Sequence, residues 1–196
     1  MMGPAGTIFG FDGHRLFGVL CAIFWGFEWV LAPRLTARAE DRIEDRGSLR
    51  WFAIGFPLAW LGAFALLGIH AASFGTVAIF RAGLLLMVAG QLLRWWSIAT
   101  LGRLFTINVA IRTDHRLIES GPYRFVRHPS YTAILVVHIG AGLCFGNVLS
   151  CLALLTPVVA AIANRIRIEE EVLCTALGPV YREYMRRTKR LIPGVY

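Results

Sequence analysis

The sequence has few charged residues and no paired cysteines, and both shortages limit what the protein can be. Charged residues make up 16% of the 196 residues, well below the roughly 25% of an average soluble domain. The four cysteines contain no CxxC pair, so the spacing predicts neither a metal site nor a disulfide framework. A GxGxxG motif after a predicted strand is also lacking, which argues against a dinucleotide-binding Rossmann fold.

Apolar residues are abundant instead, at 57% of the chain. They form five runs that we predict to be membrane helices: 16–32, 52–69, 82–99, 131–145 and 148–163. The run 52–69 contains no charged residue and would span about 27 Å as a helix. The last two runs are shorter, and only Gly146 and Asn147 separate them, so they predict a helical hairpin.

The net charge of +8 is concentrated in three segments between or after these runs. Most of the arginines lie in segments 34–50 and 101–128 and in the tail after residue 163, whereas loops 71–76 and 146–147 are uncharged. The positive-inside rule places the three basic segments in the cytoplasm and, with five crossings, the N-terminus outside. This distribution indicates topology rather than a nucleic-acid partner. A cleaved signal peptide is not expected, because the first run lacks a basic segment before it.

The arginines of segment 34–50 recur every four residues, with Glu40 and Glu44 between them. Such spacing would place the arginines on one face of a helix. We therefore predict a helix that faces solvent or lipid headgroups here, without a catalytic role.

Segment 115–131, before the fourth run, is dense in groups that can bind a polar ligand. It contains two histidines, three arginines and two tyrosines, together with a Gly121-Pro122 turn and Pro129. Pro129 fits the first turn of the helix that follows, whose N-terminal amides would then favour a carboxylate or another polar ligand. An aromatic and basic belt at the membrane surface is the alternative, but a belt needs no Gly-Pro turn and no His-Pro pair.

Segment 165–173 continues from the last apolar run. Arg165 and Glu169 are four residues apart and would share one helix face as the chain leaves the membrane. An ordinary salt bridge on a helix surface is the alternative.

Arg94 lies within the third run, where a charge is costly unless it faces a cavity or a partner. Gln91, Arg94 and Ile98 would share one inward face. Snorkelling of Arg94 to the surface is the other possibility.

Together these motifs resemble the isoprenylcysteine carboxyl methyltransferase family. The resemblance rests on GPYRFVRHPSY (121–131), RIRIEEEVL (165–173) and RLIP (190–193), and it extends from about Gly90 to Pro193. It implies an all-α membrane protein of about five transmembrane helices, with a cytoplasmic cofactor-binding loop and a C-terminal helix. One membrane-embedded domain over 1–196 is expected, with N-terminal helices in 1–75 and the catalytic part in 76–196.

The resemblance also implies S-adenosylmethionine as the cofactor and the carboxylate of a lipophilic substrate, prenylated or not, as the methyl acceptor in the membrane. Arg165 and Arg94 would bind the substrate and, with Glu169, form the catalytic set. Asn108 is a weaker candidate, while Glu28 and His138 are expected to be structural. The cofactor-binding residues implied by the motif are His115, Arg116, Leu117, Ile118, Tyr123, His128, Pro129, Ser130, Tyr131 and Glu169.

A carboxylate acceptor agrees with the residue types present. It is ionised at neutral pH and needs no general base, whereas an amine or hydroxyl must lose a proton. Three alternatives stay open: a phospholipid or amine N-methyltransferase, a sterol-reductase-like enzyme that uses NADPH, and a membrane scaffold without catalysis. The sequence does not distinguish a prenylcysteine from another lipid acid, and it predicts no oligomeric state.

Overall fold

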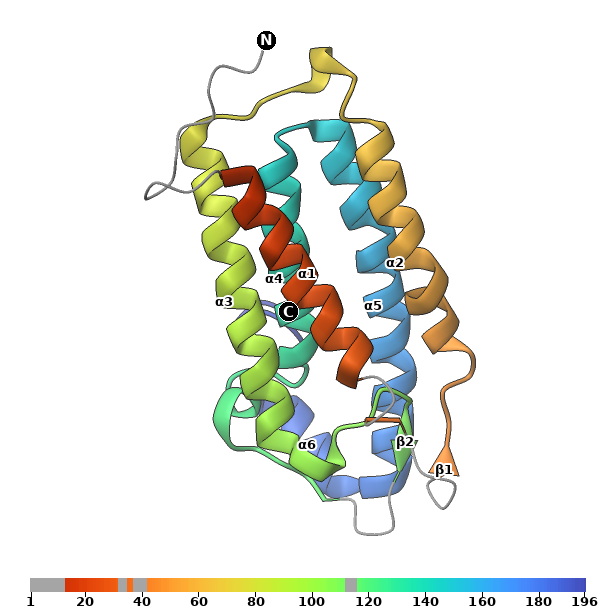
Figure 1. Ribbon diagram of the computed structural model, residues 1–196. Coiled ribbons are helices and arrows are strands. Elements are labelled where there is room, and N and C mark those ends of the chain that lie inside the picture. The colour runs from red at the N-terminus through yellow and green to blue at the C-terminus, as the bar shows by residue number, and fades with distance from the viewer. Residues whose placement is uncertain (1–12, 32–34, 37–41, 112–115) are drawn as a thin grey trace.

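The computed structural model describes residues 13–31, 35–36, 42–111 and 116–196, and these form a bundle of long helices (Figure 1). Two-residue strands β1 (Arg42–Ile43) and β2 (Ala110–Ile111) pair antiparallel at one end. The helices are α1 (Gly13–Leu31), α2 (Ser48–Ala65), α3 (Val77–Leu101), α4 (Pro129–Phe145), α5 (Val148–Leu177) and α6 (Pro179–Arg187). The runs 82–99, 131–145 and 148–163 therefore lie entirely in helices, and α1 and α2 contain most of the other two, although α2 ends at Ala65 before run 52–69 does.

Close contacts between glycines and backbone hold α3 against α4. A Cβ atom added to Gly83 would lie 2.6 Å from the carbonyl oxygen of Gly140, and one added to Gly90 would lie 2.9 Å from that of Ala133. Only glycine allows backbones to approach so closely, an arrangement common between membrane helices. Helix α2 packs on α5, and α1 crosses in front of α4 between α3 and α2 (Figure 1).

Three helices in the described part of the chain are long and apolar enough to cross a membrane. They are Ser48–Ala65, Val77–Leu104 and Val148–Leu177, and Pro129–Phe145 is a shorter apolar helix. An all-α membrane fold is thereby confirmed, while the count of five crossings stays a prediction.

The hairpin between α4 and α5 forms where it was predicted. Gly146 ends α4 in the left-handed conformation at φ 60°, which glycine adopts without strain. The side chain of Asn147 then caps α5 by accepting a hydrogen bond from the amide of Ser150 at 3.0 Å. Helix α5 is longer than its apolar run, because it continues past Ala163 to Leu177 and so carries Arg165 and Glu169 on a regular helix.

The uncharged loops and the basic segments lie at opposite ends of the bundle, as the charge pattern predicts. Segments 66–76 and 146–147 meet at one end, where Ser73 bridges to Asn147 (Figure 1). The strand pair, α6 and the loop before α4 lie at the other end, with the basic segments.

The predicted helix over 34–50 is wrong for the residues that are described there. Residues 42–43 form strand β1, because their backbone pairs with β2. Arg46 and Gly47 then take left-handed conformations, at φ 46° and 76°, which interrupt any helix before α2 begins at Ser48.

Candidate active site

A cavity of about 520 Å³ lies at the basic end of the bundle and extends between the helices. Its size is in the range of small-molecule sites, roughly 300–1,000 Å³. One wall is apolar and comes from α1, α2 and α4: Phe24, Trp25, Phe52, Ala53, Phe56, Pro57 and Ile134. The other wall bears the polar groups: Glu28, Arg94, Arg116, Tyr123, His128, Ser130, Tyr131, Arg165, Glu169, Tyr181 and Tyr184.

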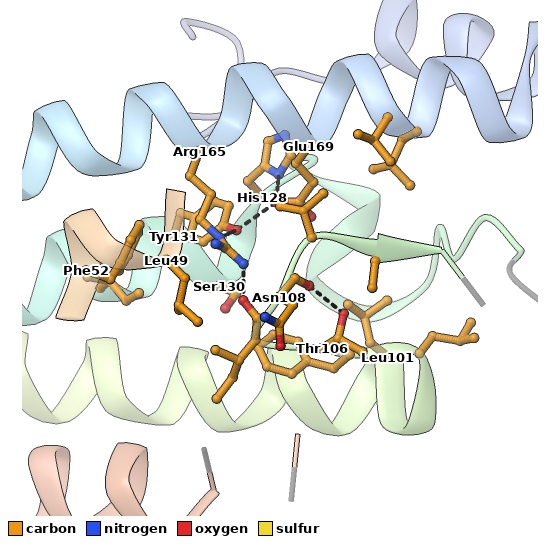
Figure 2. A pocket seen from close by; sticks show the side chains of 18 of the residues that line it. Leu49, Phe52, Leu101, Thr106, Asn108, His128, Ser130, Tyr131, Arg165 and Glu169 are labelled. Atoms are coloured by element: carbon orange, nitrogen blue, oxygen red, sulfur yellow. Dashed lines mark hydrogen bonds and ion pairs between the residues drawn. The ribbon is translucent and has the colours of Figure 1, made fainter. Parts of the chain in front are cut away.

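Arg165 enters the cavity from α5 and is buried, with 4% of its surface exposed (Figure 2). Its Nη1 donates to Asp45 Oδ1 at 2.8 Å and to Ser48 Oγ at 2.9 Å. Its Nη2 donates to the carbonyl oxygen of Ile107, and its Nε donates to the hydroxyl of Tyr131 at 2.9 Å. These partners use four N–H groups, so one N–H of Nη2 remains for a ligand within the described structure.

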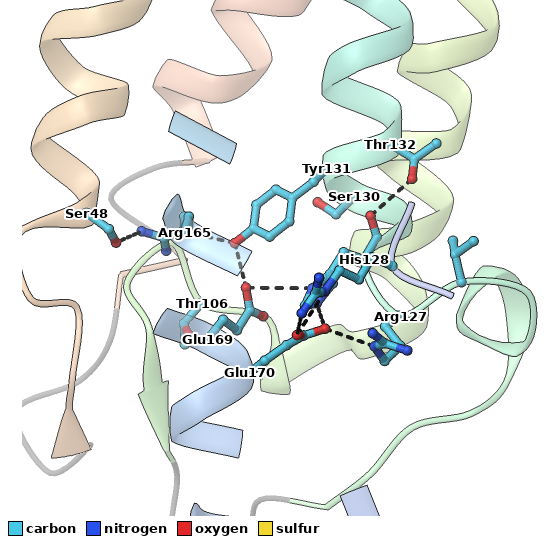
Figure 3. Close-up of polar contacts among 12 residues, drawn as sticks. Ser48, Thr106, Arg127, His128, Ser130, Tyr131, Thr132, Arg165, Glu169 and Glu170 are labelled. Carbon is cyan, nitrogen blue, oxygen red and sulfur yellow. Dashed lines mark hydrogen bonds and ion pairs between the residues drawn. The ribbon is translucent and has the colours of Figure 1, made fainter. Parts of the chain in front are cut away.

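Tyr131 connects Arg165 to Glu169 (Figure 3). Its hydroxyl accepts from Arg165 and donates to Glu169 Oε2 at 2.7 Å. The ring of Tyr131 stacks on His128, with centroids 5.6 Å apart. Glu169 keeps 30% of its side chain exposed, so its carboxylate can still accept hydrogen bonds from a molecule in the cavity.

Arg94 is buried in α3 and faces both α1 and α4. Its Nε and Nη2 donate to the two carboxylate oxygens of Glu28 at 2.8 and 3.0 Å, and its Nη1 donates to Ser130 Oγ. This bidentate pairing removes snorkelling as an explanation for Arg94. Gln91 and Ile98 are buried on the same face, as predicted, but neither is among the residues that line the cavity.

Glu170 binds several side chains on the side of the site that contacts the C-terminal segment. It is 5% exposed and accepts from Arg127 Nε at 2.9 Å and from Arg190 Nη2 at 2.8 Å. His128 Nε2 lies 3.3 Å from the same carboxylate (Figure 3). Arg127 and His128 also donate their backbone amides to the carbonyl oxygens of Lys189 and Arg190. The C-terminal segment thus fixes the loop that carries His128.

The short helix η3 (Gly121–Arg124) presents Tyr123 to the cavity. The hydroxyl of Tyr184, on α6, donates to the carbonyl oxygen of Tyr123 at 2.6 Å and so anchors η3. Burial raises the pKa of Tyr184 to about 12, so this donor keeps its proton at neutral pH.

The remaining predicted site residues divide into three groups. Arg116, Leu117, Ile118 and Asn108 line the cavity, and His115 lies outside the described residues. Pro129 begins α4, as predicted, but it is fully buried and is not part of the cavity wall.

His138 is likewise absent from that wall. Its Nδ1 lies 2.7 Å from the carbonyl oxygen of Ile134, and its Nε2 receives a hydrogen bond from Trp60 Nε1 at 3.3 Å. These contacts agree with the expected structural role.

Comparisons with known proteins relate the chain that forms this site to one enzyme family. A model of the isoprenylcysteine carboxyl methyltransferase (ICMT) family matches residues 83–175. The chain is 36% identical over 115 residues to protein-S-isoprenylcysteine O-methyltransferase B of Arabidopsis thaliana, and this match spans 58% of each chain. It is 29% identical over 184 residues to the probable protein-S-isoprenylcysteine O-methyltransferase of Oryza sativa subsp. indica, covering 92% of this chain and 95% of that one. The chain is thus similar to members of the isoprenylcysteine carboxyl methyltransferase family over the part that carries the motifs. Its enzyme class is therefore carboxyl O-methyltransferase.

A solved structure has the same fold. The structure of the eukaryotic intramembrane Ras methyltransferase ICMT matches with a TM-score of 0.64 at 20% identity, over 100% of this chain and 70% of that one. Together with the apolar helices, this fold shows an integral membrane protein.

Sequence reasoning missed the residues that hold the site arginines. Asp45 and Ser48 contact Arg165, yet both lie before the part of the chain that carries the motifs. A signal was present, because Asp is favoured at a helix start, where its carboxylate accepts from backbone amides, and Asp45 accepts from the amide of Leu49 at 2.9 Å. Glu28 was expected to be paired, and it is paired with Arg94. The cavity thus draws on both 1–75 and 76–196.

Proposed function

We propose that the protein transfers a methyl group from S-adenosylmethionine to the carboxylate of a lipophilic molecule in the membrane and forms a methyl ester. The single observation that carries this proposal is the bipartite cavity. Its apolar wall suits a lipid chain, while Arg165, Tyr131 and Glu169 form a polar cluster beside it. The match to the family model supports the reaction class, and the cavity suits a substrate with one apolar and one charged end.

The residues at the polar side fit the cofactor. Bound S-adenosylmethionine would supply a methyl group on a positively charged sulfur. The carboxylate of Glu169 suits its ammonium group, and the faces of Tyr123 and Tyr181 suit a cation. Apolar side chains beside them, such as Leu173 and Leu177, suit a purine ring. Arg116, Leu117 and Ile118 line the same cavity, as the family motif implies.

Arg165 and Arg94 are the groups that would orient the acceptor carboxylate. Arg165 offers one N–H of Nη2, and the hydroxyl of Ser130 lies beside Arg94. The carboxylate is already ionised, so the protein supplies position and exclusion of water rather than a proton acceptor. Burial of both arginines supports such a dry site, in which charges interact strongly.

We further propose that the basic end of the bundle faces the cytoplasm and that the N-terminus lies outside. Arginines gather at this end together with the cavity's polar wall, in agreement with the positive-inside rule. The lipid chain would then enter sideways from the bilayer, between helices, while the cofactor arrives from the cytoplasm.

The test uses the purified full chain in lipid nanodiscs with radiolabelled S-adenosylmethionine. N-acetyl-S-farnesylcysteine and palmitate are the acid acceptors, and phosphatidylethanolamine is the amine acceptor. Label that mild base releases as methanol from an acid acceptor is the expected result. Base-stable label on the amine would overturn the proposal.

Calorimetry with S-adenosylhomocysteine and with NADPH tests the cofactor separately. Glu169→Gln should weaken binding of S-adenosylhomocysteine, whereas Glu183→Gln, an exposed pair partner of Arg186 on α6, should not. Binding of NADPH in place of S-adenosylhomocysteine would assign the protein to a reductase-like chemistry.

A further inference from the structure

Arg165 and Arg94, the two arginines proposed to orient the acceptor, are paired with acids from the N-terminal part of the chain. Glu28 on α1 binds Arg94 through both carboxylate oxygens, and Asp45, just before α2, binds Arg165 at 2.8 Å. These two acids lie outside the segment 83–175 that matches the family model. At these two positions the cavity therefore presents an ion pair to a ligand rather than a bare cation.

Burial makes this neutralisation effective. The side chains of Arg165 and Asp45 are 5% and 11% exposed, and those of Arg94 and Glu28 are 7% and 25% exposed. Solvent and salt screen such pairs far less than surface pairs. Each arginine thus keeps its orientation, while the ion pair as a whole carries little net charge.

Asp45 is held as an anion by more than Arg165. It accepts from the hydroxyl of Ser48 at 3.0 Å and from the amides of Leu49 at 2.9 Å and Val109 at 3.3 Å. Burial by itself raises the pKa of Asp45, but the Leu49 amide and the charge of Arg165 outweigh it and leave the pKa below its usual value. The carboxylate is therefore fixed in both charge and position.

We infer that Asp45 and Glu28 are positioning residues that moderate the charge of Arg165 and Arg94, so that an acceptor carboxylate is oriented without losing its nucleophilicity. This inference rests on the proposed function. It assigns to the N-terminal helices a part in the chemistry as well as in the fold.

The charge balance of the reaction explains why such moderation helps. A carboxylate oxygen forms the new bond to the methyl carbon, while the carbon–sulfur bond breaks and its electron pair stays on sulfur. An anion and a sulfonium cation thereby become a neutral ester and a neutral thioether. Charge decreases towards the transition state, so a bare arginine would stabilise the ground-state carboxylate more than the transition state and slow the reaction.

Asp45→Asn tests the inference, since it preserves shape and removes the negative charge. With N-acetyl-S-farnesylcysteine as the acceptor, we expect both KM and kcat to fall, kcat by about tenfold. A merely structural role would lower kcat with an unchanged or raised KM. The matched control is Glu183→Gln, which removes an acid from an exposed pair on α6 and should change neither constant.

A binding measurement tests the same inference without enzyme turnover. N-acetyl-S-farnesylcysteine and its neutral carboxamide are compared by competition, and the affinity ratio of acid to amide should rise by about tenfold in Asp45→Asn. Glu28→Gln should raise it as well, through Arg94, and it leaves the start of α2 intact if Asp45→Asn does not fold. An unchanged ratio in the folded variants would overturn the inference. A wild-type protein that binds the acid but never methylates it would overturn the proposed function instead.

Discussion

The hydroxyl of Tyr131 receives a hydrogen bond from Nε of Arg165 at 2.9 Å and passes one to Oε2 of Glu169 at 2.7 Å. Arg165 and Glu169 lie one turn apart on α5, and a side chain from α4 connects them. The arginine that we propose for the substrate and the acid that we propose for the cofactor are thus linked through one oxygen atom. Any displacement of Tyr131 should disturb both halves of the site.

Tyr131→Phe removes this oxygen and keeps the ring that stacks on His128. We expect kcat to fall by about a hundredfold, because Arg165 and Glu169 lose a shared buried partner and shift. The measurement is the initial rate of ester formation, with S-adenosylhomocysteine affinity alongside. Tyr196→Phe, which removes an exposed hydroxyl near Arg190, is the control. Wild-type rates in Tyr131→Phe would mean that the bridge has no part in turnover.

Arg165→Lys keeps the charge but loses the planar group that reaches Asp45, Ser48, Ile107 and Tyr131 together. Lysine has a single terminal nitrogen and cannot make these contacts in the same geometry. We expect Arg165→Lys and Arg165→Ala to be similarly inactive, with cofactor binding largely kept in both. Calorimetry with S-adenosylhomocysteine and single-turnover assays measure the two effects. Substantial activity in Arg165→Lys would show that charge alone suffices.

Local rules predicted much of this fold and part of the site. Hydrophobic runs located the helices. The four-residue spacing of Arg165 and Glu169 predicted a shared helix face, and both lie on α5 and line one cavity. Pro129 correctly marked the start of α4. Each of these features depends on residues that are close in sequence, so helix geometry alone determines them.

The partners of the site arginines could not be predicted in this way. Asp45 lies 120 positions from Arg165, and Glu28 lies 66 positions from Arg94. Only the packing of α1 and α2 beside α3 and α5 brings these groups together. The helix predicted over 34–50 was wrong for residues 42–47 for the same reason, because pairing of β1 with β2 overrides a helical charge pattern.

Asp45→Asn should show a stability cost that depends on pH. The folded-state pKa of Asp45 is below its unfolded value, so its ion pair stabilises the protein fully above about pH 4 and is lost as pH falls through the folded value. The difference in Tm between wild type and Asp45→Asn should therefore be largest near neutral pH and shrink below about pH 4. Thermal unfolding in detergent at several pH values measures it. A difference that stays constant down to about pH 3 would show that the charge of Asp45 does not stabilise the fold.

Glu170→Gln should be among the most destabilising single changes outside the apolar core. It leaves Arg127 with a weaker partner in a buried position and loosens the attachment of Arg190. Breaking a buried pair costs about 3 kcal/mol or more, whereas an exposed pair contributes about 1 kcal/mol or less. Glu171→Gln is the matched control, since its pair with Arg46 is exposed. Equal Tm values for the two variants would contradict this assignment.

We predict that Phe56, on the apolar wall of the cavity, limits the length of the lipid chain that the proposed substrate can carry. Phe56 lines the cavity, and the centroid of its ring lies 5.1 Å from that of the His138 ring. His138 is held by Trp60, so this wall cannot easily move aside. Phe56→Ala should open space behind the wall and raise kcat/KM for geranylgeranyl over geranyl thioether acids by about tenfold.

Leu58→Ala is the control for this change, because Leu58 lies on α2 with 60% of its surface exposed. Removing a buried phenyl ring costs about 3–5 kcal/mol, so part of the Phe56→Ala protein will be unfolded. The preference is a ratio measured within one preparation, and the folded fraction cancels from it. If the ratio stays at the wild-type value, the lipid chain does not reach Phe56 and must occupy another part of the apolar wall.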